Sequence, residues 1–263
     1  MNYLVLYLVS LAVCLLGFKK YLYFISIGYG YSVAAIGVAM LAIYINELTS
    51  VTVIATLLAI AYGLRLGTFL LLREVKSGSY NEKMKTEIKS GDGISFVAKI
   101  AMWISCPLLY FAQISPVVFR LENKADSTIV SYIGVFVMAL GIIVESVADA
   151  EKSKAKKINP KRFCDTGLYK LVRCPNYLGE VLFWTGVFVT GIDSMNSALQ
   201  WIFALLGYVC IVYIMFGGAR RLEIRQDKYY GGDSEYIEYT KKTPILLPFV
   251  PLYSVKKYKW LKG

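Results

Sequence analysis

Residues 51–72 read "VTVIATLLAIAYGLRLGTFLLL", a run in which Arg65 is the one charged side chain. The hydrocarbon core of a membrane is about 30 Å thick, so a helix needs roughly 20 apolar residues to cross it. Lipid offers the backbone N–H and C=O groups no partners, so a crossing segment must bond within itself. The stretch therefore predicts a helix that crosses a membrane.

Comparable apolar runs recur along the whole chain. The sequence is 57% hydrophobic and only 18% charged, with a mean hydropathy of +0.53, which is too apolar for a soluble domain of this size. The further runs cover residues 2–18, 22–45, 96–115, 128–148, 177–192 and 198–216. We therefore expect an all-α, polytopic membrane protein with seven transmembrane helices in a single domain, residues 1–263.

The basic residues predict how the helices are oriented. If seven helices alternate, one side of the membrane collects the basic segments: Lys19 with Lys20, residues 73–93, residues 151–173 and the tail after Gly218. Of the 29 Lys and Arg residues, only Arg120 and Lys124 fall in a loop on the other side. Because basic loops stay in the cytoplasm, we expect the N-terminus outside and the C-terminus in the cytoplasm.

The net charge of +11 fits the same arrangement. Basic loops and attraction to anionic lipid headgroups account for it without a nucleic-acid partner. Membrane lipid is therefore the expected partner of the lysines near the C-terminus, which are Lys256, Lys257, Lys259 and Lys262.

Metal chemistry is disfavoured by the residue types present. The chain has no histidine, and its five cysteines form no C-x-x-C pair. Zinc and haem sites usually need imidazole or clustered thiolates, so we expect no metal centre. Proton transfer would have to come from tyrosine, lysine, cysteine or a carboxyl group with a perturbed pKa.

Polar residues inside the apolar runs are the candidate functional groups, because ionisable side chains in lipid are costly and tend to face a cavity or a partner. They fall into four clusters near the expected cytoplasmic side: Tyr62 with Arg65, Glu145 with Asp149, Asn176 with Glu180 and Trp184, and Arg220 with Arg221 and Arg225. Spacings of three or four place the members of each of the first three clusters on one helical face. Such clusters at one depth predict a single polar pocket.

Each cluster also has a purely structural interpretation. Arg65 could pair with Glu145 or Glu180 and hold helices together. Asp149 could be a solvated helix end, and Asn176 could cap the helix that follows it. Pro175 suits the first position of that helix, whose N-terminus would favour an anion.

Four stretches together resemble a known family. They are "TGLYKLVRCPNYLGEVLFWTG" at 166–186, "YGLRLGTFLLLRE" at 62–74, "GIIVESVADAEK" at 141–152 and "RRLEIRQDKYYGGDSEYIEYTKKTPILLPFVP" at 220–251. They are similar to the membrane-embedded steroid 5α-reductase superfamily, particularly its bacterial branch, whose members resemble the C-terminal part of 3-oxo-5α-steroid 4-dehydrogenase. The resemblance covers about residues 51–251.

The resemblance implies an enzyme of lipid metabolism in the bacterial inner membrane. Members of that family enclose NADPH, which enters from the cytoplasm and reduces the conjugated C=C bond of an enone. By motif position, Tyr62 would contact the substrate carbonyl, and we expect Arg65 to stabilise the charge that develops there. The cofactor-binding residues would be Asp149, Arg173, Asn176, Glu180, Arg220, Arg221, Arg225 and Tyr229, with Lys156, Lys157 and Arg162 near the phosphates.

Two departures from the family pattern matter. Cys174 stands where the bacterial branch usually has histidine. In the steroid enzymes of animals a glutamate in a Q-E-L-P-S run partners the tyrosine, whereas Glu47 in "NELTS" falls in the expected outer loop. We do not carry that glutamate's role over, so a steroid substrate is not implied.

Two other functions share parts of this pattern. Isoprenylcysteine and phospholipid methyltransferases have a similar G-x-Y-x-x-x-R-x-P-x-Y-x-G run and use S-adenosylmethionine. The arginine cluster favours the reductase, because S-adenosylmethionine has no phosphate to neutralise. A lipid-binding bundle without catalytic activity is the third interpretation.

Overall fold

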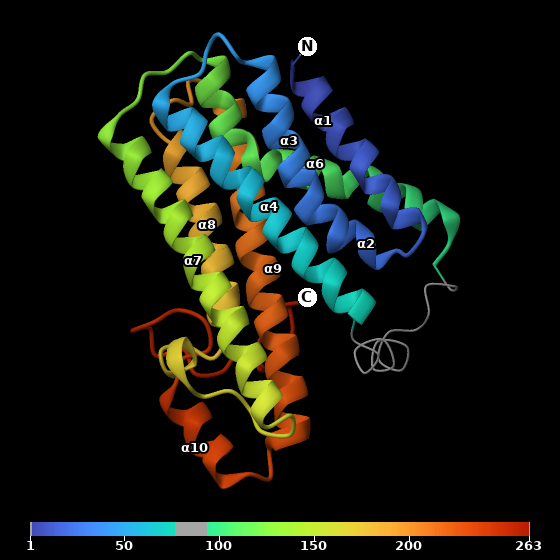
Figure 1. The fold of residues 1–263 in the computed structure, drawn as a ribbon, viewed down its shortest axis with the longest axis vertical. Helices are drawn as coiled ribbons and strands as arrows, with labels where there is room; N and C mark the ends of the chain where they lie inside the picture. Colours follow the sequence, from blue (N-terminus) through green and yellow to red (C-terminus); the bar gives the residue numbers. More distant parts are fainter. Residues whose placement is uncertain (1, 77–93, 263) are drawn as a thin grey trace. The chain divides into compact units, whose positions relative to one another are not determined.

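The computed structural model describes residues 2–76 and 94–262, and within those ranges the regular structure is entirely helical (Figure 1). Most of the basic segment expected at residues 73–93 lies outside the described residues. The elements are α1 (Asn2–Val13), η1 (Cys14–Phe18), α2 (Leu22–Ile25), α3 (Ile27–Ile43), α4 (Ser50–Lys76), α6 (Phe96–Glu122), α7 (Ile129–Ile158), η3 (Gly167–Lys170), α8 (Pro175–Gly191), α9 (Ala198–Tyr230) and α10 (Ser234–Lys242).

The all-α prediction is confirmed for the described residues, but the count of seven membrane spans is wrong. In the part of the chain that the structure describes, four helices are long and apolar enough to cross a membrane: α4, α6, α7 and α9. The segments expected at 2–18, 22–45 and 177–192 form shorter helices. The orientation of the chain stays a prediction.

The second expected span is interrupted near its start. At Ser26 the backbone leaves the helical region, with φ −126° and ψ −93°. The Ser26 hydroxyl donates a hydrogen bond to the carbonyl oxygen of Leu22 over 2.7 Å. A serine that bonds its own preceding turn offers the backbone an alternative to continuous helix, so the segment divides into α2 and α3.

Four of the described helices continue past their expected ends, and the shortest extension is that of α4, to Lys76. α6 runs to Glu122, α7 to Ile158 and α9 to Tyr230. Apolar composition marks only the part of a helix suited to lipid, whereas Ala, Glu and Lys continue the helical hydrogen bonds into polar sequence. Arg120 is therefore inside α6 and not in a loop, and residues 151–158 are helix and not loop.

The chain divides into two compact units, and the single domain stays a prediction. The first unit comprises Met1–Val135 and Val187–Gly207, and the second comprises Phe136–Gly186 and Tyr208–Gly263. Helices α7, α8 and α9 contribute residues to both units. Each unit is described by itself.

Arg120 organises the polar contacts of the first unit. Its side chain is 1% exposed, its Nε donates to the carbonyl oxygen of Thr190 over 2.8 Å, and its Nη2 pairs with Asp193. Aromatic side chains around Phe119 and Trp201 form the apolar core beside it. A buried arginine with a carboxylate and carbonyl partners is a structural element, because its charge is compensated inside the fold.

In the second unit α7 and α8 run side by side (Figure 1). A Cβ added to Gly141 would lie 2.4 Å from the Phe183 nitrogen, and one added to Gly179 would lie 2.6 Å from the Glu145 nitrogen. Only glycine permits such a close approach of two backbones.

The core of the second unit joins α9 to the segment that follows α10. Ala219 and Leu222 of α9 pack with Cys174, and the core also contains Ile245, Leu246, Val255 and Leu261 from the tail. The tail is therefore part of the fold.

Candidate functional site

The predicted site residues fall into two groups, one in each unit. Tyr62 and Arg65 belong to the first unit. The residues assigned to the cofactor belong to the second: Asp149, Arg173, Asn176, Glu180, Arg220, Arg221, Arg225 and Tyr229.

Tyr62 is fully buried on α4 and shares a hydrogen bond with Tyr29 of α3, with 3.0 Å between the two hydroxyl oxygens. The Tyr29 ring in turn lies 4.9 Å from the Tyr110 ring, centroid to centroid. A phenol that accepts a hydrogen bond from one neighbour can donate its own hydrogen to another oxygen. Tyr29 is thus a candidate that the sequence reasoning missed, although a tyrosine within an apolar helix was a usable signal.

Arg65 lies one turn beyond Tyr62 on the same helix, as the spacing predicts. It is half-buried, and its guanidinium carbon lies 5.9 Å from the centroid of the Phe69 ring. A cation over an aromatic face is held by the electrostatic attraction of the ring.

The first half of α8 carries the polar residues of the motif at 166–186. The helix begins at Pro175, as predicted, so Asn176 is its second residue and not its cap. Glu180 is 7% exposed and Trp184 is 1% exposed. The Oδ1 atom of Asn176 is buried and has no hydrogen-bond partner among the described residues. A buried acceptor without a donor is costly, so this atom marks a place where a ligand or a water can bind.

Tyr177 interacts electrostatically with three charged residues of the second unit. Its phenol lies within electrostatic reach of Glu180 on α8 and of Arg221 and Arg225 on α9. A Cβ at Gly218 would lie 3.3 Å from the Tyr177 ring, so α9 passes directly against it. Glu180 is buried, whereas both arginines are exposed. The structure thus brings together three of the predicted cofactor residues around a tyrosine that the prediction omitted.

Arg173 has a different environment. Its Nη2 donates to Glu223 Oε1 over 2.7 Å and also to the carbonyl oxygen of Tyr253. Glu223 Oε2 accepts from the backbone nitrogen of Val255 over 3.0 Å. Arg173 and Glu223 are 1% and 2% exposed. The pair joins the segment before α8 to α9 and to the tail.

Arg220 also contacts the tail. Its Nε donates to the carbonyl oxygen of Lys256 over 3.1 Å, and its Nη1 donates to that of Leu261 over 3.5 Å. Arg173 and Arg220 therefore help to hold the second unit together, whereas Arg221 and Arg225 are exposed.

The remaining cofactor candidates lie on α7 and at the end of α9. Asp149 is inside α7 and half-buried, so it is not a helix end, and it lies within electrostatic reach of Tyr169 in η3. Tyr229 is 56% exposed, and its ring centroid lies 6.4 Å from that of Tyr230.

The basic residues expected near the phosphates are largely bound within the second unit. Lys156 donates to the Tyr230 hydroxyl over 2.8 Å. Arg162 pairs with Asp165 over 2.7 Å and with Glu235. Lys157 is exposed on the last turn of α7.

Cys174, which stands in the place of the family's histidine, cannot supply a base. It is fully buried, and burial raises the pKa of its thiol to about 12, against smaller opposing effects of Lys152 and Arg173. Burial likewise raises the pKa of Tyr169 and Tyr239. The thiol stays protonated at neutral pH and is neither a base nor a nucleophile there.

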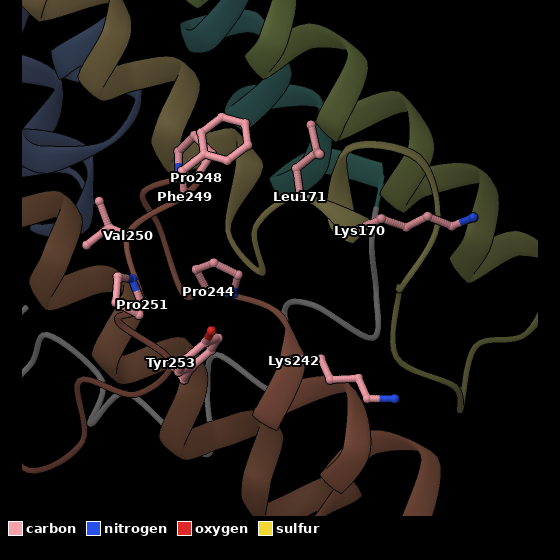
Figure 2. A pocket seen from close by; sticks show the side chains of 9 residues that line it. All are labelled: Lys170, Leu171, Lys242, Pro244, Pro248, Phe249, Val250, Pro251 and Tyr253. Carbon is pink, nitrogen blue, oxygen red and sulfur yellow. The ribbon is translucent and has the colours of Figure 1, made fainter.

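A cavity of about 260 Å³ lies elsewhere in the second unit (Figure 2). Lys170 and Lys242 border it opposite a proline-rich turn that carries the exposed Phe249. None of the predicted site residues lines it. Of its two lysines, Lys242 pairs with Glu238.

A protein-family model matches nearly the whole chain. Residues 5–243 match the family described as "Protein of unknown function (DUF1295)". The chain belongs to this family. The match begins well before residue 51, where the expected family region starts, and so includes the first helices. Searches of curated proteins and of solved structures returned no match.

The groups around Tyr177 in this DUF1295 protein fit the chemistry of a phosphorylated dinucleotide. Asn176 Oδ1 is an acceptor that has no donor within residues 2–76 and 94–262, which suits the N–H of a carboxamide. Arg221 and Arg225 lie on one face of α9 and are exposed, as guanidinium groups that bind phosphate must be.

Proposed function

We propose that the protein reduces a conjugated C=C bond in an apolar, membrane-dissolved substrate and uses NADPH as the reductant. The observation that carries this proposal is that Glu180, Arg221 and Arg225 all lie within electrostatic reach of Tyr177, whose neighbour Asn176 has a buried acceptor. The resemblance of residues 166–186 to the steroid 5α-reductase superfamily supports it.

Four residues would hold the nicotinamide half and the phosphates of the cofactor. Asn176 accepts a hydrogen bond from the nicotinamide carboxamide, and Glu180 accepts one from the same half of the molecule. Arg221 and Arg225 pair with the phosphates. When bound, NADPH supplies the hydride. Asp149 and Tyr229 are proposed to contact its adenosine half.

Arg173 and Arg220 serve the proposed site indirectly. Their guanidinium groups bind Glu223 and the tail carbonyls, which fixes α9 and hence the register of Arg221 and Arg225. Arg173 and Arg220 would therefore position the phosphate-binding residues without contacting phosphate themselves.

Tyr62 is proposed to act on the substrate oxygen. A carbonyl that accepts a hydrogen bond from a buried phenol is better able to carry the negative charge that develops during reduction. Tyr29 orients that phenol through the 3.0 Å contact. Arg65, three residues along α4, lowers the cost of the same charge.

Ligand binding tests the cofactor assignment first. We expect NADPH to raise the thermal stability of the purified protein, as a ligand specific to the folded state must. Glu180→Gln and the Arg221→Gln/Arg225→Gln pair should each weaken NADPH binding by about tenfold or more, since hydrogen bonds to charged groups contribute about 1.5–3 kcal/mol. Lys228→Gln, on the same helix, is the control and should bind normally.

Two outcomes of the ligand-binding measurement would contradict the proposal. Stabilisation by S-adenosylmethionine and not by NADPH would indicate a methyltransferase. Stabilisation by neither would indicate a bundle without a dinucleotide.

Turnover tests the catalytic assignment separately. NADPH oxidation is followed with a panel of apolar α,β-unsaturated ketones. Tyr62→Phe should lower kcat by about 10²–10³, the usual cost of losing an oxyanion donor, with NADPH affinity unchanged. An undiminished kcat would remove Tyr62 from the reaction.

A further inference from the structure

A second, larger hollow in the second unit is an apolar groove between α9 and the tail. Its volume is about 480 Å³, within the range of small-molecule sites. Val209, Val212 and Phe216 of α9 form one wall, and Leu252, Tyr258 and Trp260 of the tail form the other. The α9 wall belongs to a helix that is long and apolar enough to cross a membrane. The groove therefore opens on a surface suited to lipid.

Tyr213 fastens the tail across this groove. Its hydroxyl donates to the carbonyl oxygen of Trp260 over 2.6 Å and accepts from the backbone nitrogen of Lys262 over 3.2 Å. The Tyr213 and Trp260 rings stack with centroids 6.0 Å apart. Trp260 nevertheless remains 64% exposed. The groove is thus a fixed feature of the fold, with an exposed indole at its edge.

Lysines lie next in sequence to the tail residues Tyr258, Trp260 and Leu261, which line the groove. Lys257, Lys259 and Lys262 are exposed, and the Lys257 ammonium lies 5.1 Å from the centroid of the Tyr258 ring. Lys256, by contrast, pairs with Asp227. In the described part of the chain no carboxylate forms an ion pair with the three exposed lysines. Their charge is available to an anion.

We infer that the groove binds a membrane phospholipid with an anionic headgroup. One acyl chain lies along Val209, Val212 and Phe216, and the headgroup phosphate lies against the exposed lysines. Tyrosine and tryptophan at this boundary are typical of the level where lipid headgroups meet hydrocarbon. Basic residues at the end of a membrane helix attract anionic lipid. The inference does not depend on the proposed reduction.

Fluorescence quenching tests the lipid site. The full-length protein is placed in bilayers of phosphatidylcholine that contain either brominated phosphatidylglycerol or brominated phosphatidylcholine, with the bromines midway along the acyl chain. Trp260 is one of four tryptophans, so the difference between wild type and Trp260→Phe isolates its signal. We expect the anionic lipid to quench Trp260 several-fold more effectively than the zwitterionic lipid does.

Three variants separate the headgroup from the groove. Lys257→Gln/Lys259→Gln/Lys262→Gln should lower the preference for the anionic lipid by roughly tenfold. Val212→Phe fills the groove and should abolish the excess quenching, whereas Ile214→Phe, exposed on the same helix outside the groove, should not. Equal quenching by both lipids, or a preference that survives Val212→Phe, would overturn the inference.

Native mass spectrometry provides a measurement that needs no variant. Wild-type protein released from mixed bilayers should retain an anionic phospholipid in preference to a zwitterionic one. Release without any bound anionic lipid would contradict the site, as would a dimer that excludes lipid from the groove.

Discussion

Glu223 lies at the centre of the polar contacts in the second unit. One of its oxygens accepts from Arg173 over 2.7 Å, and the other accepts from the backbone nitrogen of Val255 over 3.0 Å. Both side chains of the ion pair are almost fully buried. Removing one partner of such a pair leaves an uncompensated charge in a low-dielectric environment, which costs far more than the pair itself contributes.

We expect Glu223→Gln to destabilise the protein by about 3–5 kcal/mol. Thermal and denaturant unfolding in detergent measure the loss. Glu238→Gln is the matched control, because Glu238 pairs with Lys242 at the surface and such pairs contribute little. The double variant Arg173→Met/Glu223→Leu should recover much of the loss. Equal stability of Glu223→Gln and wild type would show that the pair is not structural.

A second prediction at the scale of one residue concerns the thiol of Cys174. Its pKa is raised from 9.0 to about 12 in the folded protein, because burial disfavours the thiolate. The folded state therefore holds this proton more tightly than the unfolded state does. The resulting stability is fully present below pH 9 and is lost as the pH rises from 9 towards 12.

Two measurements check this prediction. The stability of wild type should fall more steeply above pH 9 than that of Cys174→Ala. Iodoacetamide at pH 8 should leave Cys174 unmodified in the folded protein and modify it in denaturant, as mass spectrometry can show. Rapid modification of the folded protein would mean that the thiol is accessible and ionised.

At the scale of the elements, the contact between α7 and α8 positions the first half of α8. Gly141 and Gly179 let the two backbones approach so closely that an added Cβ at Gly179 would meet the Glu145 nitrogen at 2.6 Å. The contact also fixes the rotation of α8, and hence where Asn176 and Glu180 lie within the second unit. Packing between helices thus determines part of the candidate site.

We expect Gly179→Ala to destabilise the second unit by about 1–3 kcal/mol, since backbone atoms cannot move aside as a flexible side chain can. Gly232→Ala is the control, because no atom lies within 4 Å of a Cβ added there. Thermal unfolding of the two variants measures the difference. If Gly179→Ala were as stable as Gly232→Ala, the helices would not be in the close contact described.

At the scale of the whole molecule, the tail extends the fold beyond the family match. That match ends at residue 243, yet Ile245, Leu246, Val255 and Leu261 are buried in the core of the second unit. Backbone bonds tie the same segment to the start of α8, where the nitrogens of Arg173 and Cys174 donate to the carbonyls of Pro244 and Ile245. The tail therefore completes the second unit.

Leu246→Ala should cost about 2–5 kcal/mol, as large-to-small changes in a packed core do. Phe249→Ala, three residues away and 96% exposed, should leave stability unchanged. Thermal unfolding and resistance to proteolysis distinguish the two variants. If Leu246→Ala left the stability unchanged and Phe249→Ala lowered it, the assignment of Leu246 to the core and Phe249 to the surface would be wrong.

The sequence by itself determined the class of this protein and the identity of its polar groups. Its apolar runs predicted the helices because lipid leaves a backbone no alternative to internal hydrogen bonds. The spacing of Asn176, Glu180 and Trp184 predicted one face of α8, and Pro175 predicted its first residue, because both depend on geometry within a single helix.

Only the tertiary structure decided which charges are structural and which remain available. Arg173 and Arg221 both belong to the stretches that resemble the steroid 5α-reductase superfamily. Arg173 is nevertheless buried against Glu223, whereas Arg221 is exposed near Tyr177. The ends of α6, α7 and α9 also escaped prediction, because hydropathy reports suitability for lipid and not the extent of a helix. Partners distant in sequence are chosen by packing, which local periodicity does not encode.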